Sequence, residues 1–453
     1  MSKIYKPPAA VRGMKVLDRD AFSNEFMTPC IRVPKIDGPR HHKLIKRLRP
    51  FLLEFHNMKT ILNEAEEGSQ QTILVDESLL ADRSTDLETV TADFKDYCQI
   101  GSHLLSVNYK NWSPRTIFKA VLPLDLQSDE DLTSSSYSQM GHVVQVNLRE
   151  EQKEYKQLIG EVLLDKIVSC RTVVNKMENV ENQFRTLSFE LLAGEADYIV
   201  EMQENGIKYK FDFSKVFWNT RLNTEHERLV KLFKSQHVVY DVCAGVGPFS
   251  IPAAKRKIAV VANDLNPDCV HYLRENAKLN KVTLQGVHCL DGKRFITDVA
   301  APDYIRRIIE TVSDKDDAPI TTGANFVMNL PAMAVEFLPA FVGLLRNIRR
   351  AEAEADSDSE AQAETAPARK KLKLDISDIP PVYVHCYTFV KGDDSYKRED
   401  FKADAVRKAK DMLSGWDLHD LNVHSVRNVA PNKEMMCISF RADEKMLLAD
   451  DAS

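Results

Sequence analysis

Apolar residues in the second half of the chain occur in short runs that alternate with helical stretches. Residues 237–240, 258–263 and 381–387 are apolar runs of strand length, and residues 250–255 read as the start of a helix. Strands that are buried on both faces of a parallel sheet show such continuous runs. Because strands and helices alternate from Lys215 onward, the pattern predicts an α/β domain with a parallel, doubly wound sheet.

The first half of the chain has a different pattern. Residues 143–147 read as a strand, 151–167 as a helix, and 199–203 with 207–213 as two strands around a turn at Glu204 to Gly206. Residues 1–125 mix helical stretches with basic residues. We therefore expect three domains, which are residues 1–125, an α+β domain at 126–213, and the α/β domain at 214–450. Within the last one, residues 351–375 begin with an acidic, low-complexity stretch that predicts a disordered insertion.

Composition narrows the class of protein only a little. With 453 residues, of which 43% are hydrophobic and 28% charged, the chain fits an ordinary soluble protein with a sizeable core. No apolar run approaches the roughly 18 residues of a membrane helix. The eight cysteines have no Cys-x-x-Cys spacing, which favours free thiols in a reducing compartment and no metal site.

Charge and targeting signals are weak. The net charge of −6 does not predict a nucleic-acid binder, but basic runs occur at 41–49, 349–350 and 369–373. Such runs are more often solvated faces than binding sites. The N-terminus has no apolar signal region, which disfavours secretion and leaves cytoplasm, nucleus and mitochondrial matrix open.

Ten residues, Asp241 to Ser250, carry the most chemical information. They join the strand at 237–240 to the following helix and contain Gly245 and Gly247, whose missing Cβ atoms allow a ligand to approach the backbone. A second acid, Asp264, follows the next strand, where a carboxylate can bind the two hydroxyls of a ribose. The pattern indicates a cofactor that contains adenosine.

The loop also indicates which cofactor. A dinucleotide loop needs a third glycine and a free helix N-terminus for pyrophosphate, but Pro248 and Phe249 follow Gly247 directly. Asp241 would repel a pyrophosphate and suits a cationic amino-acid group. This pattern resembles the class I methyltransferase fold, which binds S-adenosylmethionine. A nicotinamide-dependent oxidoreductase is disfavoured, and a tight glycine turn without a ligand is the remaining alternative.

Two further segments carry candidate chemistry. A strand ends at Asn329 to Pro331, where an Asn can present its amide to a base edge; the alternative is a helix N-cap. Thr224 and Glu227 have capping-box spacing, which would place Glu225 and His226 in the first turn of a helix. Glu225 is then either a carboxylate aimed at the substrate or an acid that favours the helix dipole.

Taken together, these segments resemble the archaeal and eukaryotic tRNA (guanine-N1)-methyltransferases, which modify guanosine 37 next to the anticodon. The resemblance covers nearly the whole chain. It is carried by residues 7–14, 141–149, 185–195, 219–226, 241–249, 329–331 and 426–433.

The resemblance implies a role for each matching residue. Glu225 is implied as the general base that removes the guanine N1 proton, Arg185 as the partner of O6, and Asn329 as the residue that positions the base. No metal is implied. The residues implied to bind S-adenosylmethionine are His226, Asp241, Gly245, Gly247, Asp264, Leu265, Asp291, Gly292 and Asn329. The sequence departs from the family at His226, where archaeal members often carry Arg, and at Leu330, where Pro is common.

The resemblance also implies the partner. We expect a monomer that does not bind a membrane. It should bind tRNA through the anticodon stem-loop and the body of the tRNA, and it should flip the target base into its pocket. The runner-up is another S-adenosylmethionine-dependent RNA base methyltransferase, acting on rRNA or on an exocyclic amine. A tRNA-binding scaffold with a decayed pocket is disfavoured, because Asp241, Asp264, Asn329 and Glu225 are all present.

Overall fold

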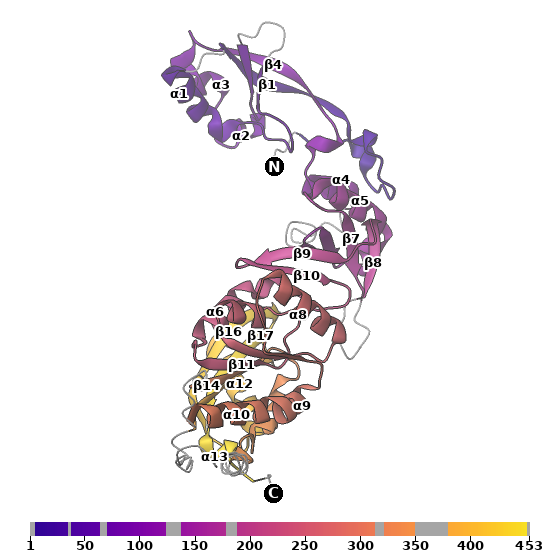
Figure 1. Cartoon of the computed structure of the whole chain (residues 1–453). Coiled ribbons are helices and arrows are strands. Elements are labelled where there is room, and N and C mark those ends of the chain that lie inside the picture. The colour runs from indigo at the N-terminus through magenta and orange to yellow at the C-terminus, as the bar shows by residue number, and fades with distance from the viewer. Residues whose placement is uncertain are drawn as a thin grey trace, which may run out of the picture. The chain divides into compact units, whose positions relative to one another are not determined.

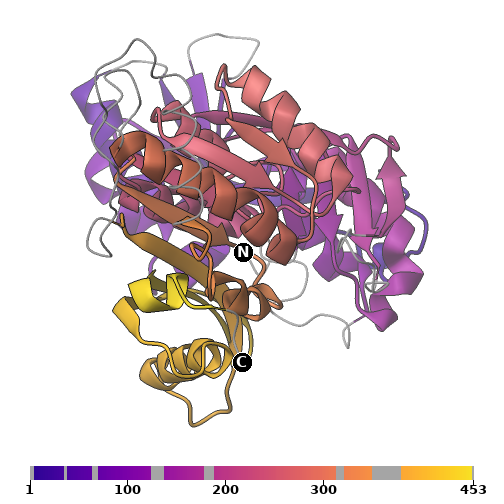
Figure 2. The same cartoon turned by 60° about the horizontal axis from the view of Figure 1, so that its bottom comes forward.

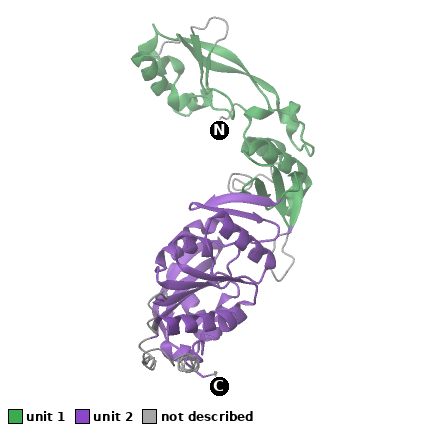
Figure 3. Cartoon of the chain, viewed as in Figure 1, with its two compact units in different colours: residues 1–178, 189–197 green, residues 179–188, 198–453 purple. Residues whose placement is uncertain are grey.

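The computed structural model describes residues 5–34, 38–63, 70–123, 137–177, 188–312, 321–348 and 379–450. The chain forms two compact units, residues 1–178 with 189–197 and residues 179–188 with 198–453 (Figure 3). The acidic insertion expected at 351–375 and the basic run at 369–373 lie outside the described residues.

The first unit contains two four-stranded sheets. One is antiparallel, in the order β2-β3-β1-β4, and the other has the order β5-β6-β7-β8 (Figure 1). The strands are β1 (Asn24–Pro34), β2 (Ile61–Asn63), β3 (Gln70–Leu74), β4 (Gln99–Val107), β5 (Tyr137–Met140), β6 (Val143–Val146), β7 (Thr172–Lys176) and β8 (Phe189–Gly194). The helices are α1 (Pro39–Leu48), α2 (Glu77–Ala81), α3 (Leu87–Val90), α4 (Pro114–Val121) and α5 (Lys156–Lys166).

The boundary expected near residue 125 does not separate two compact units. One hydrophobic cluster joins Trp112 and Phe118 to Val144 and Leu158, so residues on both sides of the expected boundary share a core. For the region before residue 125 the sequence analysis expects helical stretches and names no strand, whereas the structure also contains the antiparallel sheet β1–β4 there. A second cluster, with Ile31 and Leu44 among its members, packs α1 against that sheet.

The second unit is built on a seven-stranded sheet in the order β13-β12-β11-β14-β15-β17-β16. Neighbours from β13 to β15 are parallel, and β17 and β16 add antiparallel pairs at one edge. The strands are β11 (His237–Asp241), β12 (Ala259–Asn263), β13 (Gly286–His288), β14 (Gly323–Met328), β15 (Val382–Lys391), β16 (Leu418–Ala430) and β17 (Lys433–Ala442). The helices are α6 (Asn223–Leu232), α7 (Ser250–Lys255), α8 (Pro267–Leu279), α9 (Gly292–Arg294), α10 (Ala301–Val312), α12 (Arg398–Met412) and α13 (Glu444–Leu447). The predicted α/β, doubly wound fold is confirmed.

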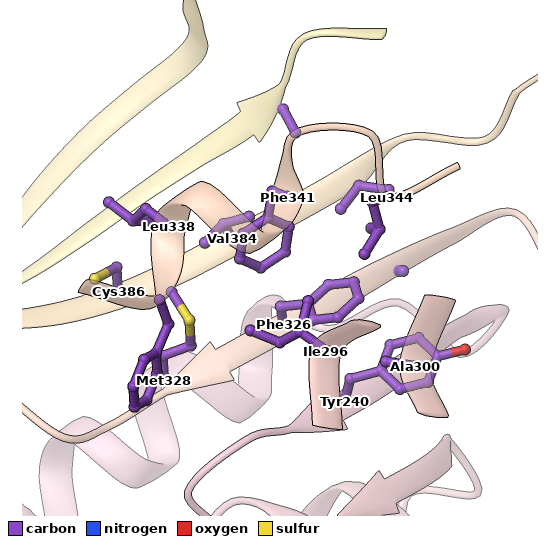
Figure 4. Packing of buried hydrophobic residues seen from close by; sticks show 14 of the residues in the cluster. Tyr240, Ile296, Ala300, Phe326, Met328, Leu338, Phe341, Leu344, Val384 and Cys386 are labelled. Carbon is purple, nitrogen blue, oxygen red and sulfur yellow. The ribbon is translucent and has the colours of Figure 1, made fainter. Parts of the chain in front are cut away.

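The largest hydrophobic cluster packs helices against this sheet (Figure 4). Tyr240 of β11 stacks on Phe326 of β14 with ring centroids 4.8 Å apart, and Phe326 meets Phe341 edge-on at 5.0 Å. At the edge of the sheet that ends with β16, the helix α12 packs against β15, β16 and β17 (Figure 2). All six residues of β14 are buried, as its apolar run predicts for a central strand.

A β-hairpin completes the second unit. Its strands are β9 (Ile199–Glu204) and β10 (Ile207–Asp212), as the sequence predicts, but it groups with residues 198–453 and not with the α+β domain expected at 126–213. The reason is a set of hydrogen bonds to α8, in which the Asn276 Oδ1 accepts from the Lys210 backbone N–H (2.8 Å) and the Asn280 Oδ1 from that of Lys208 (2.9 Å).

Candidate active site

The predicted site residues on the sheet follow its carboxyl edge. Asp241 ends β11 and is in register with Ala262 of β12 and Val327 of β14, so the loops after these parallel strands leave at the same edge. From β11 the chain first adds β12 and β13 on one side of the sheet, and it then adds β14 and β15 on the other side of β11. The strand order therefore reverses at β11. In open α/β sheets, ligands bind outside the carboxyl ends of the strands at such a switch point.

Asp241 is a buried carboxylate with one oxygen left over. Its side chain is 0% exposed, and the Ser250 hydroxyl donates to Oδ2 at 2.6 Å. Oδ1 is buried and has no hydrogen-bond partner among the described residues. Burial raises the Asp241 pKa to about 7, and the neighbouring Asp264 charge adds to the shift. A donor or a cation at Oδ1 would relieve the cost of this unpaired acceptor.

The two glycines of the loop have different reasons to be glycine. Both adopt positive φ, +54° at Gly245 and +102° at Gly247. A Cβ on Gly247 would come within 2.7 Å of the side chains of Ile251 and Leu273, so this position is required by packing. A Cβ on Gly245 would meet nothing within 4 Å. The backbone at Gly245 is therefore open to a ligand, whereas Gly247 closes the loop onto its helix.

Asp264 joins two of the edge loops. Its Oδ2 accepts the Gly245 backbone N–H at 2.8 Å, and its Oδ1 accepts that of Asn266 at 2.9 Å. Burial raises its pKa, and these two backbone N–H groups oppose the shift. Each carboxylate oxygen has further lone pairs for ribose hydroxyls. Leu265, the next residue, keeps 38% of its surface exposed.

A buried asparagine that the sequence analysis missed fixes the same loops. Asn263 is 0% exposed, and its amide donates to the carbonyls of Val242 (3.0 Å) and Leu290 (2.9 Å). Its Oδ1 accepts the Leu290 backbone N–H at 2.9 Å. Asp291 follows at once and caps α9, where its Oδ1 accepts the Lys293 backbone N–H at 2.9 Å. Asn263 thus holds the loops after β11 and β13 in one arrangement.

Gly292 and Asn329 follow β13 and β14. A Cβ on Gly292 would lie 2.7 Å from the Phe337 ring, so Gly292 is required by packing. Asn329 directly follows β14 and is half-buried. The Leu330 carbonyl accepts two backbone N–H groups at 2.8 Å, and the Pro331 carbonyl accepts the Phe389 N–H at 3.1 Å. These bonds fix the turn that carries the Asn329 side chain.

Glu225 lies in the first turn of α6, as predicted, and its carboxylate is surrounded by donors. The side chain is 3% exposed. Arg228 donates to both oxygens, from Nε to Oε2 at 2.6 Å and from Nη2 to Oε1 at 2.7 Å, and the Tyr387 hydroxyl donates to Oε1 at 2.7 Å. The His424 Nε2 lies 3.4 Å from Oε2. The burial of Glu225 and its ion pair set it apart from an ordinary solvated first-turn acid.

The predicted capping box at Thr224 is wrong. α6 starts at Asn223 with Leu222 at its N-cap, so Thr224 already lies inside the helix. The preceding 3₁₀ turn (Thr220–Leu222) takes the capping role, because the Asn219 Oδ1 accepts the Arg221 backbone N–H at 3.1 Å. The capping residue Asn219 therefore lies five residues before the expected cap at Thr224.

His226 is held by the hairpin. Its Nδ1 lies 2.7 Å from the Glu204 Oε1, and both side chains are 5% exposed. Its ring meets Phe249 edge-on at 4.9 Å, which places it beside the glycine loop. Only Nε2 is left to contact a ligand.

The remaining predicted residue, Arg185, lies outside the described residues. Conversely, the sequence analysis did not identify Arg228, Tyr387 or His424 as partners of Glu225. Arg228 could have been found from its i,i+3 spacing on the helix, but Tyr387 is 162 positions away. In the described ranges no group of three or more His, Cys, Asp or Glu side chains could hold a metal ion. None of the helices described there has the length and apolar character needed to cross a bilayer.

The strand order, the open glycine loop and the acids along the carboxyl edge define a class I methyltransferase fold. A family model described as the TRM5/TYW2 methyltransferase domain matches residues 200–313, and one described as the TYW2 N-terminal domain matches residues 115–197. A tRNA (guanine(37)-N(1))-methyltransferase of Drosophila pseudoobscura pseudoobscura is 41% identical over 97% of this chain and 91% of its own length. That of Danio rerio is 37% identical over 96% and 83%. The chain belongs to the tRNA (guanine(37)-N1)-methyltransferase family.

Solved structures agree on the fold. The crystal structure of Trm5b from Pyrococcus abyssi aligns with a TM-score of 0.58 at 23% identity, over 92% of this chain and 99% of that one. A complex of aTrm5 with tRNALeu aligns with a TM-score of 0.56 at 21% identity, over 91% and 99%.

Proposed function

We propose that this protein transfers a methyl group from S-adenosylmethionine to N1 of guanosine 37 in tRNA. Glu225 acts as the general base, Arg185 stabilises charge that develops on O6, and Asn329 positions the base. Family membership supports the reaction. The single observation that supports it within the site is the Glu225 carboxylate, which is buried and oriented by Arg228 and Tyr387.

The chemistry requires such a base. Guanine N1 carries a proton and is a poor nucleophile until the proton leaves, so transfer needs a proton acceptor and a partner for O6. A bidentate arginine orients a carboxylate through two charge-assisted hydrogen bonds, and a proton acceptor has to be held in a fixed orientation toward the substrate. A carboxylate has about four lone-pair positions. Arg228 and Tyr387 together occupy both lone-pair positions of Oε1, and Arg228 also occupies one position of Oε2. The His424 ring lies near the remaining position of Oε2. The guanine N1 proton would therefore be taken at Oε2, on the side of His424.

The residues of the carboxyl edge fit S-adenosylmethionine. This cofactor supplies the methyl group when bound. The unpaired Oδ1 of Asp241 suits its cationic amino-acid portion, and the open backbone at Gly245 allows close approach. Asp264 and Leu265 would bind the ribose and adenine. The proposed set is completed by Asp291, Gly292, Asn329 and the Nε2 atom of His226.

Product analysis tests the function directly. The purified protein should convert unmodified tRNA transcripts with guanosine at position 37 to 1-methylguanosine, identified by nucleoside mass spectrometry. Transcripts that differ only by adenosine at position 37 should take no methyl group. Methylation of both transcripts, or a methyl group on an exocyclic amine, would support the alternative of a different RNA base methyltransferase and overturn this proposal.

A further inference from the structure

Two arginines beside the Glu225 site have no carboxylate partner among the residues that the structure describes. Arg221 lies in the 3₁₀ turn directly before α6 and is exposed. Arg427 lies in β16, three residues after His424, and is partly buried. The proposed methyl transfer uses neither residue.

A β-bulge in β16 points Arg427 toward the Glu225 side of the sheet. His424 pairs with Cys437 and Arg427 pairs with Met435, with a register shift between Ser425 and Arg427. Cys437 and Met435 are two residues apart, so they lie on the same face of β17. His424 and Arg427 therefore share a face although they are three residues apart. Bulges commonly redirect a side chain in this way next to active sites.

The redirected guanidinium reaches the turn that carries Arg221. The Arg427 Nη1 donates to the Asn219 Oδ1 at 3.4 Å, and the same oxygen accepts the Arg221 backbone N–H at 3.1 Å. Asn219 thus links the two arginines through one carbonyl oxygen. Arg427 also donates from Nε to the Asn428 carbonyl at 3.2 Å.

The electrostatics of this pair are unfavourable without an anion. Burial and the positive charge of Arg221 both lower the Arg427 pKa. Among the described residues, no Asp or Glu oxygen lies within ion-pair distance of either guanidinium. Two like charges held together, one of them partly desolvated, repel each other unless an anion binds between them. Arginine forks match phosphate oxygens in shape and charge.

We propose that Arg221 and Arg427 form a clamp for a backbone phosphate of the tRNA, next to the nucleotide that enters the Glu225 site. The clamp holds the strand at its phosphate while the flipped base engages Glu225 and Asn329. This inference rests on the proposed function, because it takes the phosphate to belong to the tRNA substrate. It assigns a role to two conspicuous sequence segments, Asn219 to His226 and Val426 to Lys433.

The test is the salt dependence of tRNA binding. Equilibrium dissociation constants for an unmodified transcript are measured across a range of KCl concentrations. The Arg221→Gln/Arg427→Gln double variant should weaken binding roughly tenfold for each arginine, since each charge-assisted bond contributes about one such factor. The slope of log affinity against log salt should fall by roughly one, because the two arginines together neutralise one phosphate. The single variant Arg427→Lys keeps the positive charge but lacks the planar fork of arginine. It should therefore keep part of the slope that the double variant loses, but not the full wild-type affinity.

Controls separate binding from folding. Glutamine at 427 keeps a donor for Asn219, and thermal melting should show an intact fold. Arg407→Gln is a matched control, because Arg407 is 66% exposed but pairs with Asp404 at 2.9 Å, and its slope should stay unchanged. Affinity for S-adenosylhomocysteine, measured by calorimetry, should be equal in all variants.

Two outcomes would overturn the clamp. One is a wild-type salt slope in the double variant. The other is a double variant that loses stabilisation by inorganic phosphate but keeps the tRNA slope, which would identify free phosphate as the ligand. Failure of the wild-type protein to form 1-methylguanosine is a different result, and it would overturn the proposed function.

Discussion

At the scale of single residues, the Glu225 carboxylate combines two tasks that are often separate. It is an ion-pair partner of Arg228, at 2.6 and 2.7 Å, and it is the proposed proton acceptor. Removing its charge should therefore affect both catalysis and stability. For a variant at Glu225, both the rate of methyl transfer and the thermal stability therefore have to be measured.

We predict that Glu225→Gln lowers the single-turnover rate of methyl transfer by about 10²–10⁴-fold, the usual contribution of a general base. Arg185→Ala should cost a comparable factor through O6. tRNA and cofactor affinities should change little. The Glu225→Gln rate should recover as pH rises, because solvent can then take the N1 proton. Its melting temperature should also fall, because Arg228 keeps a partly buried charge without its partner.

Tyr387→Phe is the control for this prediction. It removes one donor to the Glu225 Oε1 but keeps the carboxylate and its arginine, so the rate should stay within roughly tenfold of wild type. If Glu225→Gln kept the full rate and lost only stability, the Glu225–Arg228 pair would be structural. The base would then have to be another residue.

Asp241 gives a second prediction at this scale. Its folded-state pKa of about 7 is above the ordinary value of 3.8, so the folded protein resists ionisation there. The unfavourable contribution is absent below pH 3.8, grows as the unfolded chain ionises, and is complete above about pH 7. Fully developed, it amounts to about 4 kcal/mol at 1.36 kcal/mol per pKa unit.

Asp241→Asn should therefore stabilise the protein without ligand at pH 8 and have a small effect at pH 4.5, measured by thermal melting at both values. The same variant should weaken S-adenosylmethionine binding, because the cationic amino-acid portion loses its carboxylate. A gain in stability that is equal at both pH values would contradict the ionisation argument.

At the scale of elements, the glycine loop separates folding from binding. Gly247→Ala places a Cβ 2.7 Å from Ile251 and Leu273 and should destabilise the unit by roughly 2–4 kcal/mol through strain and overpacking. Gly245→Ala meets no neighbour, so it should cost only about 1 kcal/mol of backbone strain but weaken cofactor binding. Chemical denaturation and calorimetry measure the two effects. Equal loss of stability in both variants would contradict the division of roles.

The sequence predicted those elements whose pattern is local. The strands β11 and β12, the helix α7 and the β9–β10 hairpin follow directly from apolar runs and turn residues. β16 was missed because it is an edge strand of largely polar residues with repeated bulges, so it shows no alternation. The sheet β1–β4 was missed because its strands pair across segments distant in sequence.

The site shows the same division. The glycine loop, Asp264, Asn329 and the position of Glu225 in a first helical turn could be identified from spacing and resemblance. The donors around Glu225 could not, because Tyr387 and His424 reach it only through the pairing of β15, β17 and β16. The capping prediction failed because Asn219 supplies an earlier cap, which makes the one at Thr224 unnecessary.

At the scale of the whole molecule, the acidic stretch between the Arg349–Arg350 pair and the strand β15 can be tested by deletion. We predict that removal of residues 352–366 leaves the rate of tRNA methylation unchanged within about twofold. A stretch that consists mostly of Ala, Glu, Ser and Asp offers too little apolar surface to form a core of its own. Loss of activity in a deletion variant with wild-type melting behaviour would assign the stretch a function.

Each of three hydrophobic clusters formed by described residues lies within one compact unit, which predicts that the two units melt separately. One of these clusters is drawn from residues 238–447, and two are drawn from residues 5–173. Multidomain chains commonly unfold in more than one step, so scanning calorimetry should resolve two transitions. S-adenosylhomocysteine should raise only the transition of the unit that contains Asp241, Gly245 and Asp264.

The size of that shift follows from the binding equilibrium. At a ligand concentration of about 100 times Kd, binding adds about 2.7 kcal/mol, which corresponds to a shift of roughly 5–11 °C for a unit of this size. Asp264→Ala is the control and should abolish most of the shift while leaving the other transition at its wild-type temperature. A single transition that moves as a whole with ligand would mean that the units unfold together, and cofactor binding would then stabilise the unit of residues 1–178 and 189–197 as well.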